Sequence, residues 1–389
     1  MARLWALLVA WGLGLAQLLY LPLDDRPPNL APCAWGVVLC PPREAYRGPE
    51  GADLEALRAW LLATPGRGLV ASLDALAYGG LVQSRHLPLA PEDALARLAP
   101  LLAWKARGGG ALYLFGVVPR WDASRRERNL RVLRALASWR GLRGVYLEAR
   151  ALGYPARPGA DEAGQVLLLR AFRPGLRVAV VYEDEALRAR VTPYEGLPLE
   201  ETVAGVLASA RAVAVPLAEG PDLVLYVYGG GDPRKAALDL LRLMARHPVA
   251  LADLARVNRG DPRLMAYLEG MGLYARLAAY AAWGTPANNL GSALAQGGLF
   301  LEDREGRLSR LAEAYFQYWW GEVGRPWVRA RFPEPLPEEA QAVAEGFPRV
   351  ELDGFWLDLR GLAFPWRRSF EAWPELALVP RRAGPALGR

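Results

Sequence analysis

Short apolar segments that stop abruptly at polar residues recur along most of this chain. The first, over residues 18–23, ends at Asp24, Asp25 and Arg26, and two prolines follow it. Proline has no backbone N–H to donate to a sheet, so a strand ends there. Similar segments occur at residues 68–73, 111–118, 145–147, 177–182, 222–228, 249–252 and 278–283, mostly with helical patterns between them. One of these patterns predicts a helix over residues 91–107, with a proline in its first turn. This alternation predicts parallel sheets, which bind ligands at the carboxyl ends of their strands.

The segments fall into two similar series, which predicts an α/β fold with two Rossmann-like parallel-sheet lobes. We place the N-terminal lobe at residues 17–172 and the second lobe at residues 173–300. From residue 301 an aromatic-rich helical pattern is followed by strand-like alternation, so we expect a small helical and β C-terminal cap at residues 301–380. If the short strands at residues 36–40 and 211–215 are set aside, eight strands are left, and the alternative fold is a (β/α)8-like barrel.

The first 16 residues have the pattern of a secretory signal peptide. A positive residue at Arg3 precedes an apolar run, and Gly14 and Ala16 are the small residues expected before a cleavage site. This pattern predicts a secreted or periplasmic protein, with a cytoplasmic protein as the alternative, and no membrane insertion beyond the leader. The chain has two cysteines, Cys33 and Cys40. They either form one disulfide or pack as two small apolar side chains.

The net charge of +6 does not indicate a nucleic-acid partner. Of the 47 basic residues only Lys105 and Lys235 are lysines, and the arginines are scattered rather than arranged in a stripe with interleaved aromatics. The sequence motifs of a serine nucleophile (G-x-S-x-G), a zinc protease (H-E-x-x-H) and a phosphate-binding P-loop are absent. We therefore expect no nucleotide cofactor. The sequence leaves open whether the chemistry uses a divalent cation or no cofactor at all.

Carboxylates that follow strands or precede helices are the main candidates for chemistry. Two carboxylates about 5–10 Å apart can act as acid and base or nucleophile in a glycosidase, and the same oxygens suit Mg²⁺ or Ca²⁺. Structural roles are the alternative, because Asp25 could pair with Arg26, and Asp161 with Glu162 could charge a helix N-terminus. The predicted catalytic residues are Asp24, Asp25, Asp74, Asp161 and Glu162.

Arginines that directly follow strands could bind an anionic group through two hydrogen bonds. A tryptophan and two amides near residue 285 offer a sugar a stacking face and hydrogen bonds, although Thr285 and Asn289 equally suit a turn and a helix cap. We therefore expect a small-molecule or glycan ligand. The predicted substrate-binding residues are Arg26, Tyr78, Arg85, Arg120, Asn129, Asp253, Asn258, Trp283, Thr285 and Asn289.

Several ordered motifs resemble those of one bacterial family. They lie at residues 22–27, 72–85, 128–129, 159–162, 252–258, 279–289 and 364–367. Through them the chain resembles the domain of unknown function 4127 (DUF4127) family. Two features depart from the family pattern. Gly284 stands where the family usually has asparagine, and a pair of aspartates expected after the strand at residues 145–147 is not evident, since Glu148 follows that strand. The family has no established reaction, so the resemblance implies site positions and no activity.

Taken together, these patterns favour a hydrolase, and we expect a carbohydrate-active enzyme of the glycosidase kind. Asp24 or Asp25 would supply one carboxylate of the pair, and Asp74, Asp161 or Glu162 the other. A metal-dependent hydrolase or phosphatase that uses the same carboxylates is one alternative. A non-catalytic two-lobed protein that binds a sugar or a sugar acid is the other.

Overall fold

The computed structural model describes residues 17–118, 123–137, 145–151, 162–192, 194 and 196–381. The chain forms two compact units. The first contains the chain up to Gly175 together with Ala189–Ala212, and the second contains Leu176–Arg188 together with the chain from Val213 onward.

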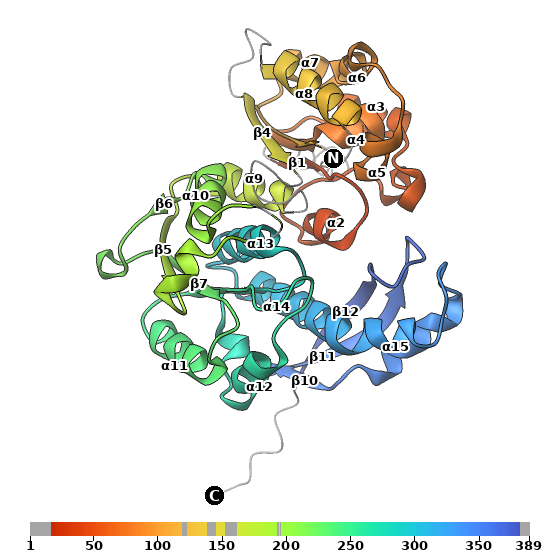
Figure 1. Ribbon diagram of the computed structural model, residues 1–389. Helices are drawn as coiled ribbons and strands as arrows, with labels where there is room; N and C mark the ends of the chain where they lie inside the picture. Colours follow the sequence, from red (N-terminus) through yellow and green to blue (C-terminus); the bar gives the residue numbers. More distant parts are fainter. Residues whose placement is uncertain are drawn as a thin grey trace, which may run out of the picture. The chain divides into compact units, whose positions relative to one another are not determined.

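The first unit is built on a parallel sheet of four strands (Figure 1). Its strands are β1 (Leu18–Leu21), β2 (Gly68–Ser72), β3 (Ala111–Val118) and β4 (Val145–Ala151), in the order β1-β2-β3-β4. Since all four run in the same direction, their carboxyl ends lie along one edge, and Asp24, Asp25 and Asp74 follow directly from two of them.

Helices cover both faces of this sheet. On one face, Leu19, Leu69 and Leu112 belong to a core with α3, α4, α7 and α8. Tyr20 points to the opposite face, which α9 covers. The approach of α9 is close, because a Cβ on its Gly164 would collide with the Tyr20 hydroxyl oxygen. The helices of this unit are α2 (Pro27–Ala34), α3 (Leu54–Ala63), α4 (Leu73–Tyr78), α5 (Leu81–His86), α6 (Pro91–Arg97), α7 (Ala99–Ala106), α8 (Ala123–Ala137), α9 (Ala163–Phe172) and α10 (Leu199–Ala210).

Two local predictions for the first unit were wrong. The strand predicted at residues 36–40 is reduced to a single parallel bridge between Leu39 and Leu19, in a segment that ends at two prolines and carries a disulfide between Cys33 and Cys40. The helix predicted over residues 91–107 is broken after Arg97, because Pro100 has no N–H to continue the hydrogen-bond ladder.

The second unit is built on a parallel sheet of five strands. The strands are β5 (Arg177–Tyr182), β6 (Val213–Ala214), β7 (Leu223–Tyr228), β8 (Val249–Asp253) and β9 (Ala279–Ala281), in the order β6-β5-β7-β8-β9. The predicted α/β fold with two parallel sheets is therefore confirmed. The described strands form two separate sheets, so the alternative of one closed barrel was wrong.

One face of this second sheet is covered by α13 (Pro286–Leu299). Its glycines let the helix lie close to the strands: a Cβ on Gly297 would be only 2.9 Å from the Cβ of Ala250 in β8, too close for two carbon atoms. The other face packs against α11 (Pro233–Met244), α12 (Pro262–Gly270) and α14 (Arg304–Trp319), as Figure 1 shows. A π-helical turn, η6 (Trp320–Gly324), joins α14 to α15 (Arg325–Arg329).

A three-stranded antiparallel sheet completes the second unit. Its strands are β10 (Val350–Leu352), β11 (Phe355–Ala363) and β12 (Trp373–Pro380). Aromatic side chains pack this region onto α14 and η6. The ring of Trp319 is edge-on to that of Phe347, with 5.0 Å between the ring centroids, and the centroids of Trp320 and Phe364 are 5.6 Å apart. The strand-like alternation predicted for this part of the chain is therefore real.

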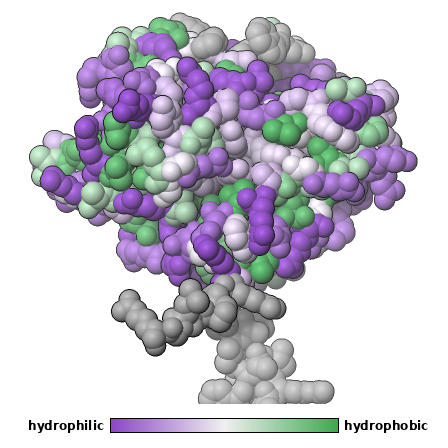
Figure 2. Space-filling view, turned by 90° about the horizontal axis from the view of Figure 1, so that it is seen from below, coloured by the Kyte–Doolittle hydropathy of each residue, from purple (hydrophilic) through white to green (hydrophobic). Residues whose placement is uncertain are grey.

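The surface carries hydrophobic residues in small groups. Figure 2 shows them among hydrophilic residues on the face that it draws. None of the helices in the described part of the chain is long and apolar enough to cross a membrane. The residues most suited to bind a ligand are polar, and they lie at the carboxyl ends of the strands.

Candidate functional site

Asp24 lies three residues after β1, buried in the first unit. The Nε of Arg26 donates to both of its oxygens at 3.1 and 3.0 Å, and the Nδ2 of Asn29 donates to Oδ1 at 2.8 Å. The sequence suggested an ion pair between Asp25 and Arg26; the structure has one between Asp24 and Arg26, at 2.9 Å. Partners of this kind favour the charged form of a carboxylate.

Asp25 is also buried, and its Oδ2 accepts a hydrogen bond from the backbone N–H of Gly48 at 3.1 Å. Glu162 is fully buried at the start of α9. That end of α9 reaches the turn after β1, because the Nε2 of Gln165 donates to the Pro28 carbonyl at 2.9 Å. Asp161 and Arg120, two other predicted site residues, lie outside the described residues.

Asp74 is buried in the first turn of α4, directly after β2. Its Oδ2 accepts a hydrogen bond from the backbone N–H of Val117, in β3, at 2.7 Å. Burial raises the pKa of Asp74 to about 7, against the opposing effects of the Val117 N–H and of the positive charge on Arg128. Asp74 can therefore hold or release a proton near neutral pH, as a general acid must.

Tyr78 lies one turn after Asp74 in the same helix, and it too is buried. The Arg128 guanidinium lies over its ring, 4.3 Å from the centroid, and burial raises the pKa of Tyr78 to about 12. Its hydroxyl donates to no acceptor among the described residues. A bound ligand could therefore accept a hydrogen bond from it.

The predicted substrate residue Asn129 is a structural link, since its Nδ2 donates to the Val117 carbonyl at 3.0 Å and its Oδ1 accepts from Arg128 Nε at 2.9 Å. Arg85 is partly buried in the last turn of α5. Arg128 also donates to the carbonyls of Ser84 and Leu87, so these contacts fix the ends of β3 and α5 around Asp74.

Gly80 connects the surroundings of Asp24 and Asp74. Its backbone N–H donates to the carbonyl of Asp74 at 3.1 Å, and a Cβ at this position would lie 3.6 Å from the Cβ of Asp24. Its φ of +135° belongs to a region that is almost closed to other residues. The turn between α4 and α5 therefore lies against Asp24, at the edge of the sheet that also carries Asp74.

Replacement of Gly80 by alanine is expected to destabilise the protein by about 1–3 kcal/mol. The new Cβ would be held at an unfavourable φ and would lie 3.3 Å from the Leu23 carbonyl oxygen. Thermal unfolding measures the effect. Gly270→Ala is the matched control, because a Cβ there meets nothing within 4 Å; equal melting temperatures for the two variants would contradict the prediction.

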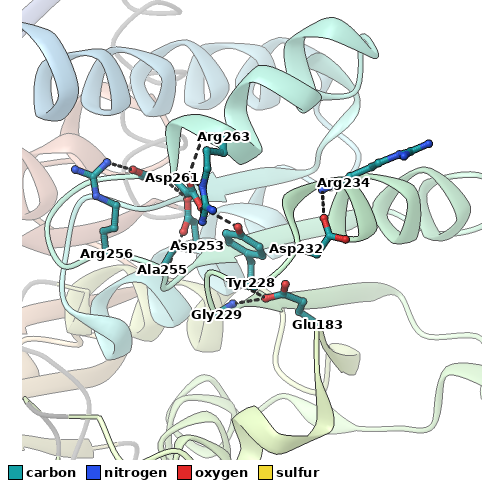
Figure 3. A network of polar contacts seen from close by, with 12 residues as sticks. Glu183, Tyr228, Gly229, Asp232, Arg234, Asp253, Ala255, Arg256, Asp261 and Arg263 are labelled. Atoms are coloured by element: carbon teal, nitrogen blue, oxygen red, sulfur yellow. Dashed lines mark hydrogen bonds and ion pairs between the residues drawn. The ribbon is translucent and has the colours of Figure 1, made fainter.

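In the second unit, Asp253 ends β8 and is fully buried. Its Oδ2 accepts hydrogen bonds from the Asp261 backbone N–H at 2.8 Å and from the Tyr280 hydroxyl at 3.0 Å, and its Oδ1 accepts from the Ala255 N–H at 3.1 Å. Burial raises its pKa to about 6. Asp253 thereby closes the loop of residues 253–261 (Figure 3).

Asp261 holds the other end of this loop and caps α12. It accepts hydrogen bonds from the Tyr228 hydroxyl at 2.8 Å and from an Arg263 terminal nitrogen at 3.0 Å. Burial alone would raise the pKa of Asp261, but the bonds from Arg263 and Tyr228 outweigh it, and the pKa lies below its ordinary value. Neither Asp261 nor Tyr228 was predicted from the sequence as a site residue.

Asn289 uses its side-chain amide on backbone groups. Its Nδ2 donates to the Asp253 carbonyl at 2.9 Å, and its Oδ1 accepts from the Gly284 N–H at 2.8 Å. Asn258, at a φ of +60°, donates its own N–H to the Gly284 carbonyl at 3.1 Å. These two asparagines therefore position the loops after β8 and β9. Trp283 and Thr285 are partly exposed beside them.

Glu183 is a buried acid whose role the sequence does not reveal, because it begins an acidic triplet, a pattern typical of a solvated loop. It lies where the strand order reverses, between β5 and β7, and its Oε2 accepts hydrogen bonds from the N–H groups of Gly229 at 2.9 Å and Gly231 at 3.2 Å (Figure 3). The three consecutive glycines after β7 were the signal that could have revealed it. A pocket of about 300 Å³ adjoins this turn; it is lined by Gly229, Gly230, Ala255, Arg256, Asp261, Pro262 and Arg263.

Within the described ranges, no group of three or more His, Cys, Asp or Glu side chains is arranged to hold a metal ion.

Two parallel-sheet units, each with buried acids at the carboxyl ends of its strands, define an α/β protein with its polar sites at the sheet edges. The chain belongs to the family described as "Protein of unknown function (DUF4127)", whose model matches residues 18–138 and 147–373. The resemblance seen in the sequence is thereby confirmed. A search of curated proteins and a search of solved structures each found no match.

Proposed function

We propose that this protein is a carbohydrate-active hydrolase of the glycosidase kind, with its carboxylate pair in the first unit. The observation that carries the proposal is the contrast between two strand-end acids. Asp24 is bound by Arg26 and Asn29, which favour its charged form, whereas burial raises the pKa of Asp74 to about 7. Carboxyl groups in contrasting environments are the usual basis for separate acid and base roles.

In this proposal Asp74 donates a proton to the glycosidic oxygen as the bond to the sugar breaks. Asp24 or Asp25 acts on the other side, in one of two ways. It takes a proton from the attacking water, or it attacks the sugar carbon to form a covalent intermediate, which a water then cleaves as Asp74 takes that water's proton. The Tyr78 hydroxyl, which donates to no acceptor among the described residues, would bind the substrate. Arg26 and Arg85 would orient it through its hydroxyl or acidic groups.

The test is an activity screen of the purified full chain against aryl glycosides and polysaccharides, with and without EDTA, between pH 4 and pH 9. We expect hydrolysis that EDTA does not change and that declines as the pH rises through about 7, where Asp74 loses its proton. Loss of activity in EDTA would favour the metal-dependent hydrolase instead. Saturable sugar binding without turnover on any substrate would favour the non-catalytic binding protein.

We also propose that the protein works in a secreted or periplasmic compartment. The disulfide between Cys33 and Cys40 supports this, because such bonds persist mainly in oxidising compartments. Fractionation of cells that produce the tagged chain tests the proposal, and recovery in the cytoplasm would contradict it.

A further inference from the structure

Three arginines in the second unit gather around one glutamate. Arg256 and Arg259 belong to the loop of residues 253–261, while Glu322 lies in the π-helical turn η6 and Arg325 begins α15. A terminal nitrogen of Arg256 lies 2.8 Å from Glu322 Oε2, and the Nε of Arg259 lies 4.0 Å from Glu322 Oε1. An Arg325 terminal nitrogen donates to the Asn258 carbonyl at 3.0 Å.

The charges in this cluster do not balance. Arg256 and Arg259 both face the Glu322 carboxylate, and the charge on Arg325 lies near it without an ion pair to it. Burial, together with nearby Arg329 and Arg259, lowers the pKa of Arg325. The nearby acid Asp261 is already bound to Arg263. The cluster therefore has an excess of positive charge that an anion would neutralise.

The cluster also has hydrogen-bonding capacity to spare. The separation of 4.0 Å between Arg259 and Glu322 is too long for a hydrogen bond, and Arg259 makes no other one among the described residues. Its side chain is 45% exposed, so a ligand can reach it.

The backbone that carries these arginines is held firmly. Asp253 binds the loop at both ends, through the N–H groups of Ala255 and Asp261, and Arg325 holds the loop at the Asn258 carbonyl. In Figure 3, Arg256 points away from the pair formed by Asp253 and Asp261. The loop follows β8 at the carboxyl edge of the sheet, and π-helical turns such as η6 often occur at functional sites.

We propose that Arg256, Arg259 and Arg325 form a binding site for an oxyanion, the carboxylate or phosphate group of a small ligand. Guanidinium groups match both anions with paired hydrogen bonds. Arg259 provides the accessible donor, Arg325 adds charge from α15, and Glu322 orients Arg256. The site does not depend on the hydrolase proposed for the first unit.

The test is calorimetric titration of the full chain with inorganic phosphate and, separately, with glucuronate, at constant ionic strength set with NaCl. We expect saturable binding of at least one anion, weakened about tenfold in Arg259→Gln through loss of one charge-assisted contact. Arg242→Gln is the control, because Arg242 is 76% exposed on α11 and lies outside the cluster; it should bind as the unaltered chain does. The two titrations show whether a phosphate or a carboxylate is preferred.

A second variant separates ligand binding from a structural role. Glu322→Gln removes the one negative charge in the cluster, so it should tighten anion binding even if it lowers the melting temperature. Circular dichroism without anion checks that each variant is folded. The proposal is overturned if the unaltered chain binds neither anion, if Arg259→Gln binds equally well, or if Glu322→Gln weakens binding.

Discussion

Replacement of Asp74 by asparagine is expected to lower kcat by a factor of about 10²–10⁴, the usual contribution of a general acid. The same change should make the protein more stable above pH 7. Asparagine keeps an oxygen for the Val117 N–H, which lies 2.7 Å from Asp74 Oδ2, but its amide has no acidic proton to transfer to a leaving group. A variant that is inactive and yet more stable is not expected from simple damage to the fold.

The stability effect follows from the pKa of Asp74, which is 3.8 ordinarily and about 7 in the folded protein. Between these two pH values the folded state holds a proton that the unfolded state releases, so stability falls as the pH rises. The loss is complete above pH 7 and amounts to about 4 kcal/mol. The asparagine side chain cannot ionise, so the variant escapes this loss.

Urea unfolding at pH 4 and pH 8 measures the stability effect, and initial rates on the substrate found in the screen measure the activity. Asp93→Asn is the control, since Asp93 is an exposed acid in the first turn of α6. Its activity and its pH dependence should match those of the unaltered chain. Full activity in Asp74→Asn would remove Asp74 from the mechanism, and an unchanged difference in stability between pH 4 and pH 8 would contradict the raised pKa.

The strands were well predicted because their signal is local. β3 and β5 have the predicted bounds, Ala111–Val118 and Arg177–Tyr182, since each is an apolar run of strand length that stops at a proline or at acidic residues. The helix over residues 91–107 was predicted less well. Pro91 starts a helix as expected, but Pro100 lies inside the predicted range and divides it into two helices. Local patterns thus located the sheets and the strand ends that carry the acids.

The roles of polar residues were harder to predict, because their partners lie far away in the sequence. Glu183 begins an acidic triplet, yet it binds the glycine turn 46 residues later. Asn289 suggested a sugar contact, yet its amide holds the Asp253 carbonyl. Arg26 could be placed next to an acid, but its ion pair is with Asp24 instead of Asp25. Hydrophobic periodicity places a strand, but only the assembled fold shows which hydrogen bonds a polar side chain makes.

The substitution with the largest expected loss of folding stability is at Asp253. Replacement of Asp253 by alanine should destabilise the protein by about 3–5 kcal/mol, because three donors lose their acceptor in the interior. These donors are the Ala255 N–H, the Asp261 N–H and the Tyr280 hydroxyl. The loop of residues 253–261 should loosen, and with it the positions of Arg256 and Arg259. Denaturant unfolding measures the free energy, and hydrogen exchange of the loop amides measures the loosening.

The cost should also depend on pH. In the folded protein the pKa of Asp253 is raised from 3.8 to about 6, so the part of its contribution that depends on the bound proton is lost as the pH rises through 6. Asp253→Ala should therefore cost about 1 kcal/mol more at pH 5 than at pH 8. Asp358→Ala, which removes an exposed acid on β11, should change the stability by less than about 0.5 kcal/mol at either pH. Equal losses in the two variants would mean that Asp253 does not hold the loop, and the arrangement of arginines beside it would lose its physical basis.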